Sequence, residues 1–282
     1  MQLPRISVLL PLALAGSAVF AASRDVQEEA PRPRILVTND DGFDTPGLAA
    51  LTAALSEFAE VVVSAPDGNR SGASLSTVVL RDEHGVRRVE VEGASEAWAV
   101  DATPADAAAF GVLHLGGERG FDLVVSGINA GPNVGSLSHY SGTVGAAMDA
   151  AGRGYTAMAV SQADYRNPAP AAEFAATFAR RLLDEGGEPG VVYNVNVPRY
   201  AGDAPQPVVV APMGGHFIEL VSVDVDLGED GSGQFAMNIK YPGAEQPGCD
   251  LEAYNTGAIT IAPLRYDWTA RSEVERLGSW DW

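Results

Sequence analysis

Short runs of β-branched residues alternate with longer helical stretches between Arg34 and Val197. The first unit of this pattern is the strand RILVT at 34–38, followed by a helix that begins at Pro46 and by the strand VVVSA at 61–65. The order strand, helix, strand is typical of βαβ units, which build a mostly parallel sheet. The sequence therefore predicts an α/β fold with helices on both faces of such a sheet.

The same alternation continues along the chain and indicates a Rossmann-like core over residues 34–200. In TPADAAAFGVLHL, Thr103 is placed to cap a helix that begins at Pro104, with Asp106 three residues after the cap. We expect the core to be complete after its last strand. The other expected elements are the rest of that helix to about Leu115, a strand at 122–126, an alanine-rich helix to about Gly152, a strand near 157–161, a helix near 170–184 and a strand near 191–197.

Residues 201–282 follow a different pattern and are expected to form a β-hairpin extension and a C-terminal tail. VSVDVDL at 221–227 and QFAMNIKY at 234–241 alternate apolar and polar residues around the turn-rich GEDGSG, which predicts a long hairpin. The acidic residues there also suggest a calcium loop, but the glycine and the closing glutamate of such a loop are missing. A solvated hairpin is the better interpretation. Those acidic residues are Asp224, Asp226, Glu229 and Asp230.

The N-terminus has the pattern of a secretory signal. Residues 1–21 contain one arginine, an apolar stretch and small residues before the expected cleavage point, and residues 22–33 would form a linker. We therefore expect export, with the periplasm as destination and no membrane attachment after cleavage; a retained membrane anchor is the alternative. The single cysteine, Cys249, excludes an internal disulfide.

The formal net charge of −19 restricts the partners of the protein. Nucleic-acid polymers and anionic membranes need a positive surface that displaces counterions, so direct binding to either is not expected. An anionic small substrate would need a metal ion at its site. Most of the acidity is explained by a solvated surface suited to an extracytoplasmic setting.

Three polar, glycine-containing loops follow predicted strands of the core. They are NDDG at 39–42, PDGNRSGAS at 66–74 and SGINAGPNVGSLSHYSGT at 126–143. Ligands of an open parallel sheet bind beyond the carboxyl ends of its strands. We therefore expect the three loops to converge on one site.

Asp40 and Asp41 are adjacent carboxylates at the end of a buried strand. They repel each other and stay ionised only where a cation or hydrogen-bond donors compensate them. A hard cation such as Mg²⁺ or Mn²⁺ prefers oxygen ligands, and the Ser71 hydroxyl and the Asn129 amide oxygen could complete its shell. The alternative is that one aspartate caps the next helix while the other forms a turn.

Ser141, Gly142 and Thr143 open the alanine-rich helix. The free N–H groups and the dipole of a helix N-terminus favour an anion such as phosphate, so these residues could form a phosphate cradle. The same three residues could also be an ordinary helix cap.

The sequence lacks the usual motifs of other ligand-binding sites. Neither GxxxxGKS nor GxGxxG follows the first strand, so nucleoside triphosphates and dinucleotides lack their usual motifs. The four histidines show no metal-ligand spacing. His139 lies in the third loop and is an acid/base candidate, whereas His114 is expected on a helix surface.

Taken together, the loops resemble the SurE family of metal-dependent 5'/3'-nucleotidases. ILVTNDDG, APDGNRSGAS, VSGINAGPNVG and YSGTVGAAM follow the family's order and spacing, and the resemblance extends over about residues 34–265. One departure is ATPAD at 102–106, where the family commonly has GTP-x-DC, so that Ala102 and Ala107 replace a glycine and a cysteine. The hairpin sequence also diverges from that of the family.

The resemblance implies a metal-dependent phosphomonoesterase that hydrolyses nucleoside monophosphates and forms a homodimer or a dimer of dimers. The divalent ion, Mg²⁺ or Mn²⁺, would be held by Asp40, Asp41, Ser71 and Asn129. One of the two aspartates would in addition orient or deprotonate the attacking water. The other phosphate oxygens would be held by Asn39, Asn133, Ser141, Gly142 and Thr143.

Two other classes share parts of this pattern. A periplasmic module that binds an anion or nucleotide without hydrolysing it could use the same glycine-rich loops. The paired carboxylates would repel such an anion unless a metal is present. A nicotinamide oxidoreductase shares the layered fold, and fold alone does not decide function.

Overall fold

The structure is a computed structural model that describes residues 31–80, 83–199, 202, 205–244 and 246–282. The expected signal peptide at 1–21 and most of the expected linker at 22–33 lie outside the described residues. Among the described residues, no helix combines the length and the hydropathy that a membrane span requires.

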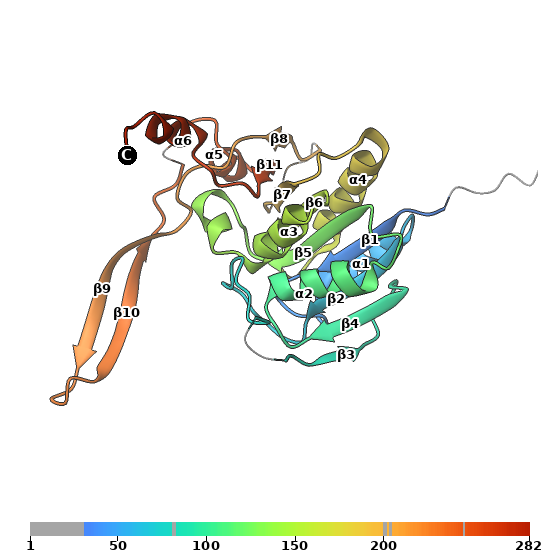
Figure 1. Ribbon diagram of the computed structural model, residues 1–282, viewed down its shortest axis with the longest axis horizontal. Coiled ribbons are helices and arrows are strands. Elements are labelled where there is room, and N and C mark those ends of the chain that lie inside the picture. Colours follow the sequence, from blue (N-terminus) through green and yellow to red (C-terminus); the bar gives the residue numbers. More distant parts are fainter. Residues whose placement is uncertain (1–30, 81–82, 200–201, 203–204, 245) are drawn as a thin grey trace, which may run out of the picture. The chain divides into compact units, whose positions relative to one another are not determined.

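A mixed sheet forms the centre of the fold (Figure 1). Within the described residues it has nine strands in the order β3-β4-β2-β1-β5-β6-β7-β11-β8. The strands from β4 to β7 are parallel to their neighbours, whereas β3 and β11 are antiparallel to β4 and β7. The bounds are β1 Arg34–Thr38, β2 Glu60–Pro66, β3 Val86–Arg88, β4 Glu96–Val100, β5 Leu123–Ala130, β6 Ala157–Gln162, β7 Val191–Val197, β8 Val208–Val210 and β11 Ile259–Arg265.

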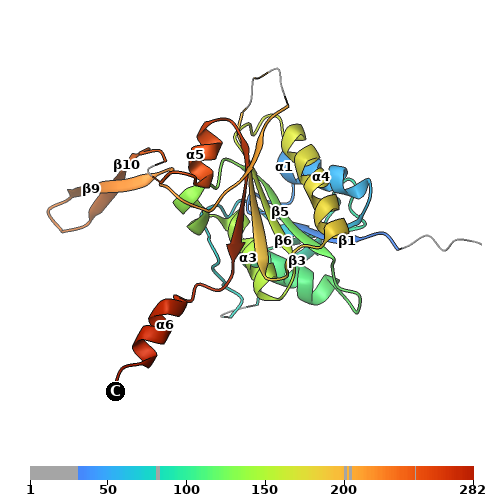
Figure 2. The same ribbon diagram turned by 90° about the horizontal axis from the view of Figure 1, so that it is seen from above.

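Helices cover both faces of the sheet because its central strands are apolar on both sides. In β1, Ile35 and Val37 pack with α1 (Pro46–Ser56) and α4 (Ala169–Glu185). Leu36 points the other way, into a second core with α3 (Gly142–Gly152) and the π-helical turn Gly111–Leu115 that follows α2 (Pro104–Phe110). Figures 1 and 2 show these helices against the sheet. The predicted Rossmann-like α/β architecture is confirmed.

The sheet does not end at residue 197, where we expected the core to be complete. The chain returns after the hairpin through α5 (Asp250–Asn255), and β11 then pairs with β7 from Thr260–Asn196 to Arg265–Val191. The short strand β8 adds to the far side of β11. Because β7 would otherwise be a buried strand with an open edge, these later segments complete the core. The sheet therefore extends past the boundary that we predicted at residue 200.

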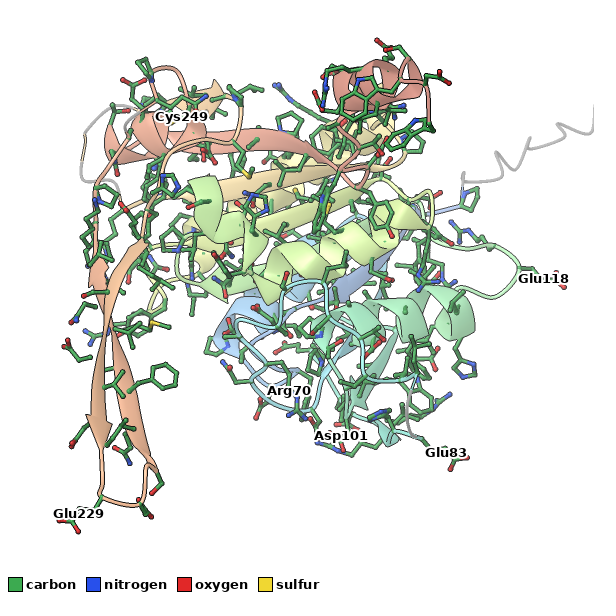
Figure 3. All side chains as sticks on the ribbon, turned by 60° about the vertical axis from the view of Figure 1, so that its left-hand side comes forward. Arg70, Glu83, Asp101, Glu118, Glu229 and Cys249 are labelled. Atoms are coloured by element: carbon green, nitrogen blue, oxygen red, sulfur yellow. The ribbon has the colours of Figure 1, made fainter. Side chains whose placement is uncertain are left out.

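The predicted hairpin is confirmed as β9 (Glu219–Leu227) and β10 (Gly233–Lys240) (Figure 2). Its register places Val225 opposite Phe235 and Val223 opposite Met237, so these four apolar residues share one face. All four are exposed. The hairpin is thus amphipathic, yet its apolar face lies outside the core. Glu229 marks its tip in Figure 3.

A last helix, α6 (Arg271–Gly278), follows β11 (Figure 2). None of its residues is buried, and Trp268, Trp280 and Trp282 around it are exposed. This tail carries aromatic surface but adds nothing to the two cores.

Candidate functional site

The three loops converge at the carboxyl ends of β1 and β5, where the strand order reverses. There the backbone N–H of Arg70 donates to the Asp40 carbonyl at 2.7 Å, which ties the second loop to the first. The Ala130 N–H at the end of β5 donates to Asp41 Oδ2 at 3.1 Å and brings in the third loop. Such a switch point is the usual ligand site of an open α/β sheet. The predicted convergence is confirmed.

Asp40 is buried, with 2% of its surface exposed. The pKa of its carboxyl is raised to about 6: burial is the main cause and the charge of Asp41 adds to it, while hydrogen bonds from the Thr143 side chain and backbone oppose the shift. The Thr143 hydroxyl donates to Asp40 Oδ1 at 2.5 Å. The N-terminal turn of α3 therefore faces a buried carboxylate.

Asp41 is half-buried and receives donors on both of its carboxylate oxygens. The Asn69 amide lies 3.3 Å from Oδ1, and the Ala130 N–H lies 3.1 Å from Oδ2. These donors partly compensate its charge, which answers how two adjacent aspartates can coexist here. Neither aspartate caps α1: its N-cap is Thr45, and the cap has no side-chain bond.

Asn129 and Ser71 bring neutral oxygens to the same edge. The Asn129 amide donates from Nδ2 to the Gly131 carbonyl at 2.7 Å, and no bond to its Oδ1 is found among the described residues. β5 carries an extra residue just before it, since Ser126 pairs with Ala159 and Asn129 with Ser161. Bulges of this kind re-aim a side chain beside a site. Ser71 is exposed, and its N–H bonds to Asn69.

The oxygens that could bind a metal here are two carboxylates, one hydroxyl and one amide. No group of three or more His, Cys, Asp or Glu side chains able to hold a metal occurs in the described part of the chain. A site built from these four groups would thus rely on neutral oxygens for half of its protein ligands. Such a donor set fits Mg²⁺ or Mn²⁺, which prefer oxygen and retain several waters.

Asn39 and Ser141 have structural roles in this site. The Asn39 amide donates to the Gly42 carbonyl and to Thr45 Oγ1 at 2.8 and 3.2 Å, and accepts from the Gly42 N–H, which closes the NDDG turn. Ser141 caps α3 by accepting from the Val144 N–H at 3.1 Å. The ordinary helix cap that the sequence allowed at Ser141 is therefore confirmed.

Gly142 is required by the approach of α3 to the carboxylates. A Cβ at this position would lie 2.8 Å from Asp40 Cβ and 2.9 Å from Asp40 Oδ2. Only glycine therefore lets the helix start against Asp40. No hydrogen bond from the Gly142 N–H is found among the described residues, so this donor remains available to a ligand.

Asn133 is the centre of a buried network that fixes the third loop. Its amide donates to Ser161 Oγ at 2.8 Å, its N–H donates to Asn196 Oδ1 at 2.7 Å, and its carbonyl accepts from Asn194 at 2.8 Å. We did not single out Asn194 and Asn196 from the sequence. Their alternation with valine in NVNV was the available signal, because it places both amides on one face of β7.

The histidines take no part in these bonds. His139 is exposed, and only its carbonyl is engaged, by the Ser74 hydroxyl at 2.7 Å. His114 lies on the surface, as expected, with its ring 5.1 Å from that of Phe110. Within the described residues, no hydrogen bond to the ring of His139 is found, and its role as an acid/base candidate stays a prediction.

The backbone of Arg70 contacts the site, whereas its guanidinium pairs with aspartates outside the site. Its guanidinium forms ion pairs with Asp101 at 2.8 Å and with Asp67 at 3.1 Å (Figure 3). The Asp101 pair links the second loop to the residue after β4, whereas the Asp67 pair lies within the loop; both are exposed, so each contributes little to stability.

Asp106 anchors the far end of the same loop. Its carboxylate accepts from the Thr77 hydroxyl at 2.5 Å and from the Val78 N–H at 2.9 Å, and its own N–H donates to the predicted cap, Thr103, at 3.2 Å. Burial alone would raise the pKa of Asp106, but these hydrogen bonds, together with that of Thr103, outweigh it and lower the pKa. The loop that carries Ser71 is therefore fixed by a charged group.

Replacing Asp106 by asparagine should lower the free energy of unfolding at pH 7 by about 1–3 kcal/mol, the cost of losing charge-assisted bonds to a buried group. Because the folded pKa is below the unfolded value of 3.8, the wild-type advantage is complete above that value and is lost as the pH falls through the folded pKa. Urea unfolding between pH 7 and pH 3 measures this. Asp184→Asn, an exposed change on α4, is the control and should stay within about 0.5 kcal/mol. An equal loss for both variants, or a loss independent of pH, would contradict the anchor role.

The fold and this site together define a Rossmann-like α/β protein with an acidic, oxygen-rich ligand site at its switch point. The sequence matches the family model described as Survival protein SurE over residues 35–219. The chain belongs to the SurE family.

Full-length relatives agree with this family. The chain is 39% identical over 250 residues to the 5'/3'-nucleotidase SurE of Klebsiella pneumoniae (strain 342), covering 88% of this chain and 96% of the relative. It is 38% identical over 266 residues to the 5'-nucleotidase SurE of Deinococcus radiodurans, covering 90% and 95%. Among solved structures, the SurE protein from Aquifex aeolicus superposes with a TM-score of 0.75 at 29% identity, covering 87% of this chain and 98% of that one. The matched family region, residues 35–219, includes all three site loops.

Proposed function

We propose that this protein is a phosphomonoesterase that hydrolyses nucleoside monophosphates to nucleoside and phosphate. The observation that carries the proposal is the convergence of Asp40, Asp41 and the start of α3 on one point, with Thr143 bonded to Asp40. Carboxylates bind a cation, and a helix N-terminus binds an anion. The two together therefore suit a phosphoryl group that is accompanied by a metal ion. The relatives named above as 5'- and 5'/3'-nucleotidases support this substrate class.

The activity is proposed to depend on a divalent metal, Mg²⁺ or Mn²⁺. Asp40, Asp41, the Ser71 hydroxyl and the Asn129 Oδ1 would hold it. The chemistry that such an ion supplies is neutralisation of phosphoryl charge and activation of water for in-line attack. Without it, the two carboxylates would repel a phosphate.

The other residues of the site bind and orient the substrate. The Gly142 N–H is available to a phosphoryl oxygen, and the dipole of α3 favours the negative charge there. Ser141 and Thr143 fix this helix start, while Asn39 and Asn133 fix the loops on either side. One carboxylate oxygen of the aspartate pair would accept a hydrogen bond from the attacking water and direct its lone pair to phosphorus.

Phosphate release from 5'-AMP in the presence of Mn²⁺ tests the function. Activity that is lost in EDTA and restored by Mn²⁺ is the expected result. Binding of 5'-AMP without any release of phosphate would support the periplasmic binding module instead. A nicotinamide oxidoreductase has no support in the relatives, and its GxGxxG motif is absent after β1.

We also propose that the protein is exported and associates as a homodimer or a dimer of dimers. The pattern of residues 1–21 supports export, and N-terminal sequencing of protein from its native host tests it: a mature start near Ala22 is expected. The apolar face of the hairpin supports association, because it exposes Val223, Val225, Phe235 and Met237 together.

Replacing Phe235 by aspartate should shift the protein toward monomers in light scattering at micromolar concentration, because it places a charge on the apolar face of the hairpin. Gln234→Asp places the same group on the opposite, polar face and should leave the mass unchanged. Wild type that is monomeric throughout, or equal effects of both variants, would contradict association through this face.

A further inference from the structure

A cleft of about 530 Å³ lies at the carboxyl ends of β6 and β7. The last residue of each strand lines it, Gln162 in β6 and Val197 in β7. The remaining polar lining comes from Asp164, Asn167, Arg199 and Gln206. Its volume falls within the range of about 300–1,000 Å³ that is typical of small-molecule sites.

The register of the sheet places this cleft next to the proposed reaction site. Gln162 pairs with Ala130 across β5 and β6, and the Ala130 N–H is the group that donates to Asp41 at 3.1 Å. Neighbouring strands lie about 4.8 Å apart, so the cleft begins one strand away from β5 and two strands away from β1, which the aspartates follow. A substrate whose phosphate lies at Asp41 can therefore extend into it.

A second cavity, of about 320 Å³, is placed differently. It runs along the flank of α3 past Gly145 and Met148 and against Pro263 and Leu264 of the antiparallel strand β11. Ser74 and Ser141 of the site loops also line it, so it reaches from the start of α3 to β11, but its described lining contains no asparagine or glutamine.

Gln162 is the residue that points to a ligand. Only 4% of its surface is exposed, yet no side-chain hydrogen bond to it is found within the described residues. Its neighbour Ser161 faces the other side of the sheet, where it accepts from Asn133. Buried amides are normally hydrogen-bonded, and this amide is not fully enclosed, so its polar atoms open onto the cleft. An amide held at the wall of a cleft without a protein partner is suited to a ligand that supplies one.

The charges of the cleft select the kind of ligand. Arg199 Nη2 lies 3.7 Å from Asp164 Oδ1, so the two formal charges of the lining offset each other. Gln206 is fixed by bonds from its Nε2 to the carbonyls of Pro198 and Gly257, at 3.2 and 3.0 Å. Neutral amides pair with the hydrogen-bonding edges of nucleobases, as glutamine does with adenine. A second phosphate would instead meet Asp164.

We propose that this cleft binds the nucleoside part of the substrate and that Gln162 is a specificity-determining residue that hydrogen-bonds the base. The inference rests on the proposed nucleotidase function, because it assigns the remaining part of the same substrate. It predicts that nucleoside binding and phosphate chemistry are separable by mutation.

The test compares Gln162→Leu with Gln234→Leu, which makes the same chemical change on the polar face of the hairpin. Each variant is assayed with 5'-AMP and with p-nitrophenyl phosphate, which has no nucleoside. Loss of one hydrogen bond to the base should lower kcat/KM for 5'-AMP about tenfold, while kcat/KM for p-nitrophenyl phosphate stays within about twofold of wild type. Asn167→Ala, at an exposed position of the same cleft, is a second variant. It should lower kcat/KM for 5'-AMP but not for p-nitrophenyl phosphate.

Calorimetric titration with adenosine in EDTA gives a readout that needs neither metal nor turnover. Wild type and Gln234→Leu should bind adenosine equally, and Gln162→Leu about tenfold more weakly. Should wild type bind adenosine through Gln162 but release no phosphate from any monoester, the proposed function fails and the cleft assignment holds. The assignment would be overturned if wild type did not bind adenosine, or if wild type and Gln162→Leu bound it equally. It would also be overturned if Gln162→Leu lowered kcat/KM equally for 5'-AMP and for p-nitrophenyl phosphate.

Discussion

Replacing Asp41 by asparagine should lower turnover of 5'-AMP by roughly 100-fold or more, while the protein stays folded. Even groups that only support a metal ligand are worth about 10–100-fold in affinity or activity, and Asp41 is proposed as a ligand itself. The fold should survive because Asp41 is half-buried, and an asparagine oxygen can still accept from the Ala130 N–H. Phosphate release in Mn²⁺ measures the loss.

Thermal unfolding of the same variant separates the metal role from a structural one. The charge of Asp41 raises the pKa of Asp40, so removing it relieves repulsion in the metal-free protein. Asp41→Asn should then be at least as stable as wild type in EDTA, but gain much less stability from Mn²⁺, which acts by binding the folded state. Asp44→Asn is the matched control: it is exposed, three residues away, and should behave as wild type. Equal stabilisation by Mn²⁺ in all three proteins, with turnover retained, would contradict a metal site at NDDG.

The second large effect is expected from Gly145→Ala in α3. A Cβ at Gly145 would lie 1.9 Å from the Ser74 carbonyl oxygen and 2.4 Å from its carbon, which are backbone atoms that cannot rotate away. The loop that carries Asn69 and Ser71 must therefore move off the helix. Since overpacking typically costs about 1–3 kcal/mol, the protein should be destabilised by that amount. Activity should fall by roughly 100-fold, because even a shift of about 1 Å in a positioned group can have that effect.

Gly278→Ala is the control for this prediction. Gly278 ends α6, and a Cβ there meets nothing within 4 Å among the described residues. Chemical unfolding and 5'-AMP turnover should both match wild type. A Gly145→Ala protein with normal stability and turnover would show that the contact between α3 and the Ser74 loop is not needed for the site.

The centre of the sheet could be predicted from the sequence because its strands are continuous apolar runs with helical segments between them. β1, β2, β5, β6 and β7 follow this rule. β11 is also an apolar run, but it joins the sheet only after the chain has left the core for the hairpin, so its place beside β7 does not follow from the order of the elements. The exposed three-residue strand β3 lacks an apolar pattern altogether.

The site residues were predictable where the chemistry depends on residue type, and less so where it depends on contacts between distant segments. Two adjacent aspartates after a buried strand repel each other in any fold, so their charges need compensation. The need for Gly142 arises because Asp40 lies against it, which is a tertiary contact that the sequence does not show. The same holds for Asn133, which lies at the centre of a hydrogen-bond network with β6 and β7. Gln162 could not be singled out, because a glutamine at the end of a strand is ordinary until its lack of a partner is known.

The hydrogen bond from Thr143 to Asp40 joins positions 103 residues apart in the chain. All of β2, β4, α2 and β5 is synthesised between them, so the phosphate-binding end of α3 cannot meet the carboxylates until most of the parallel sheet has been assembled. Catalytic competence is therefore a late event in folding. Recovery of turnover during refolding is therefore expected to report that β1, the strands that follow it through β5 and the start of α3 have come together.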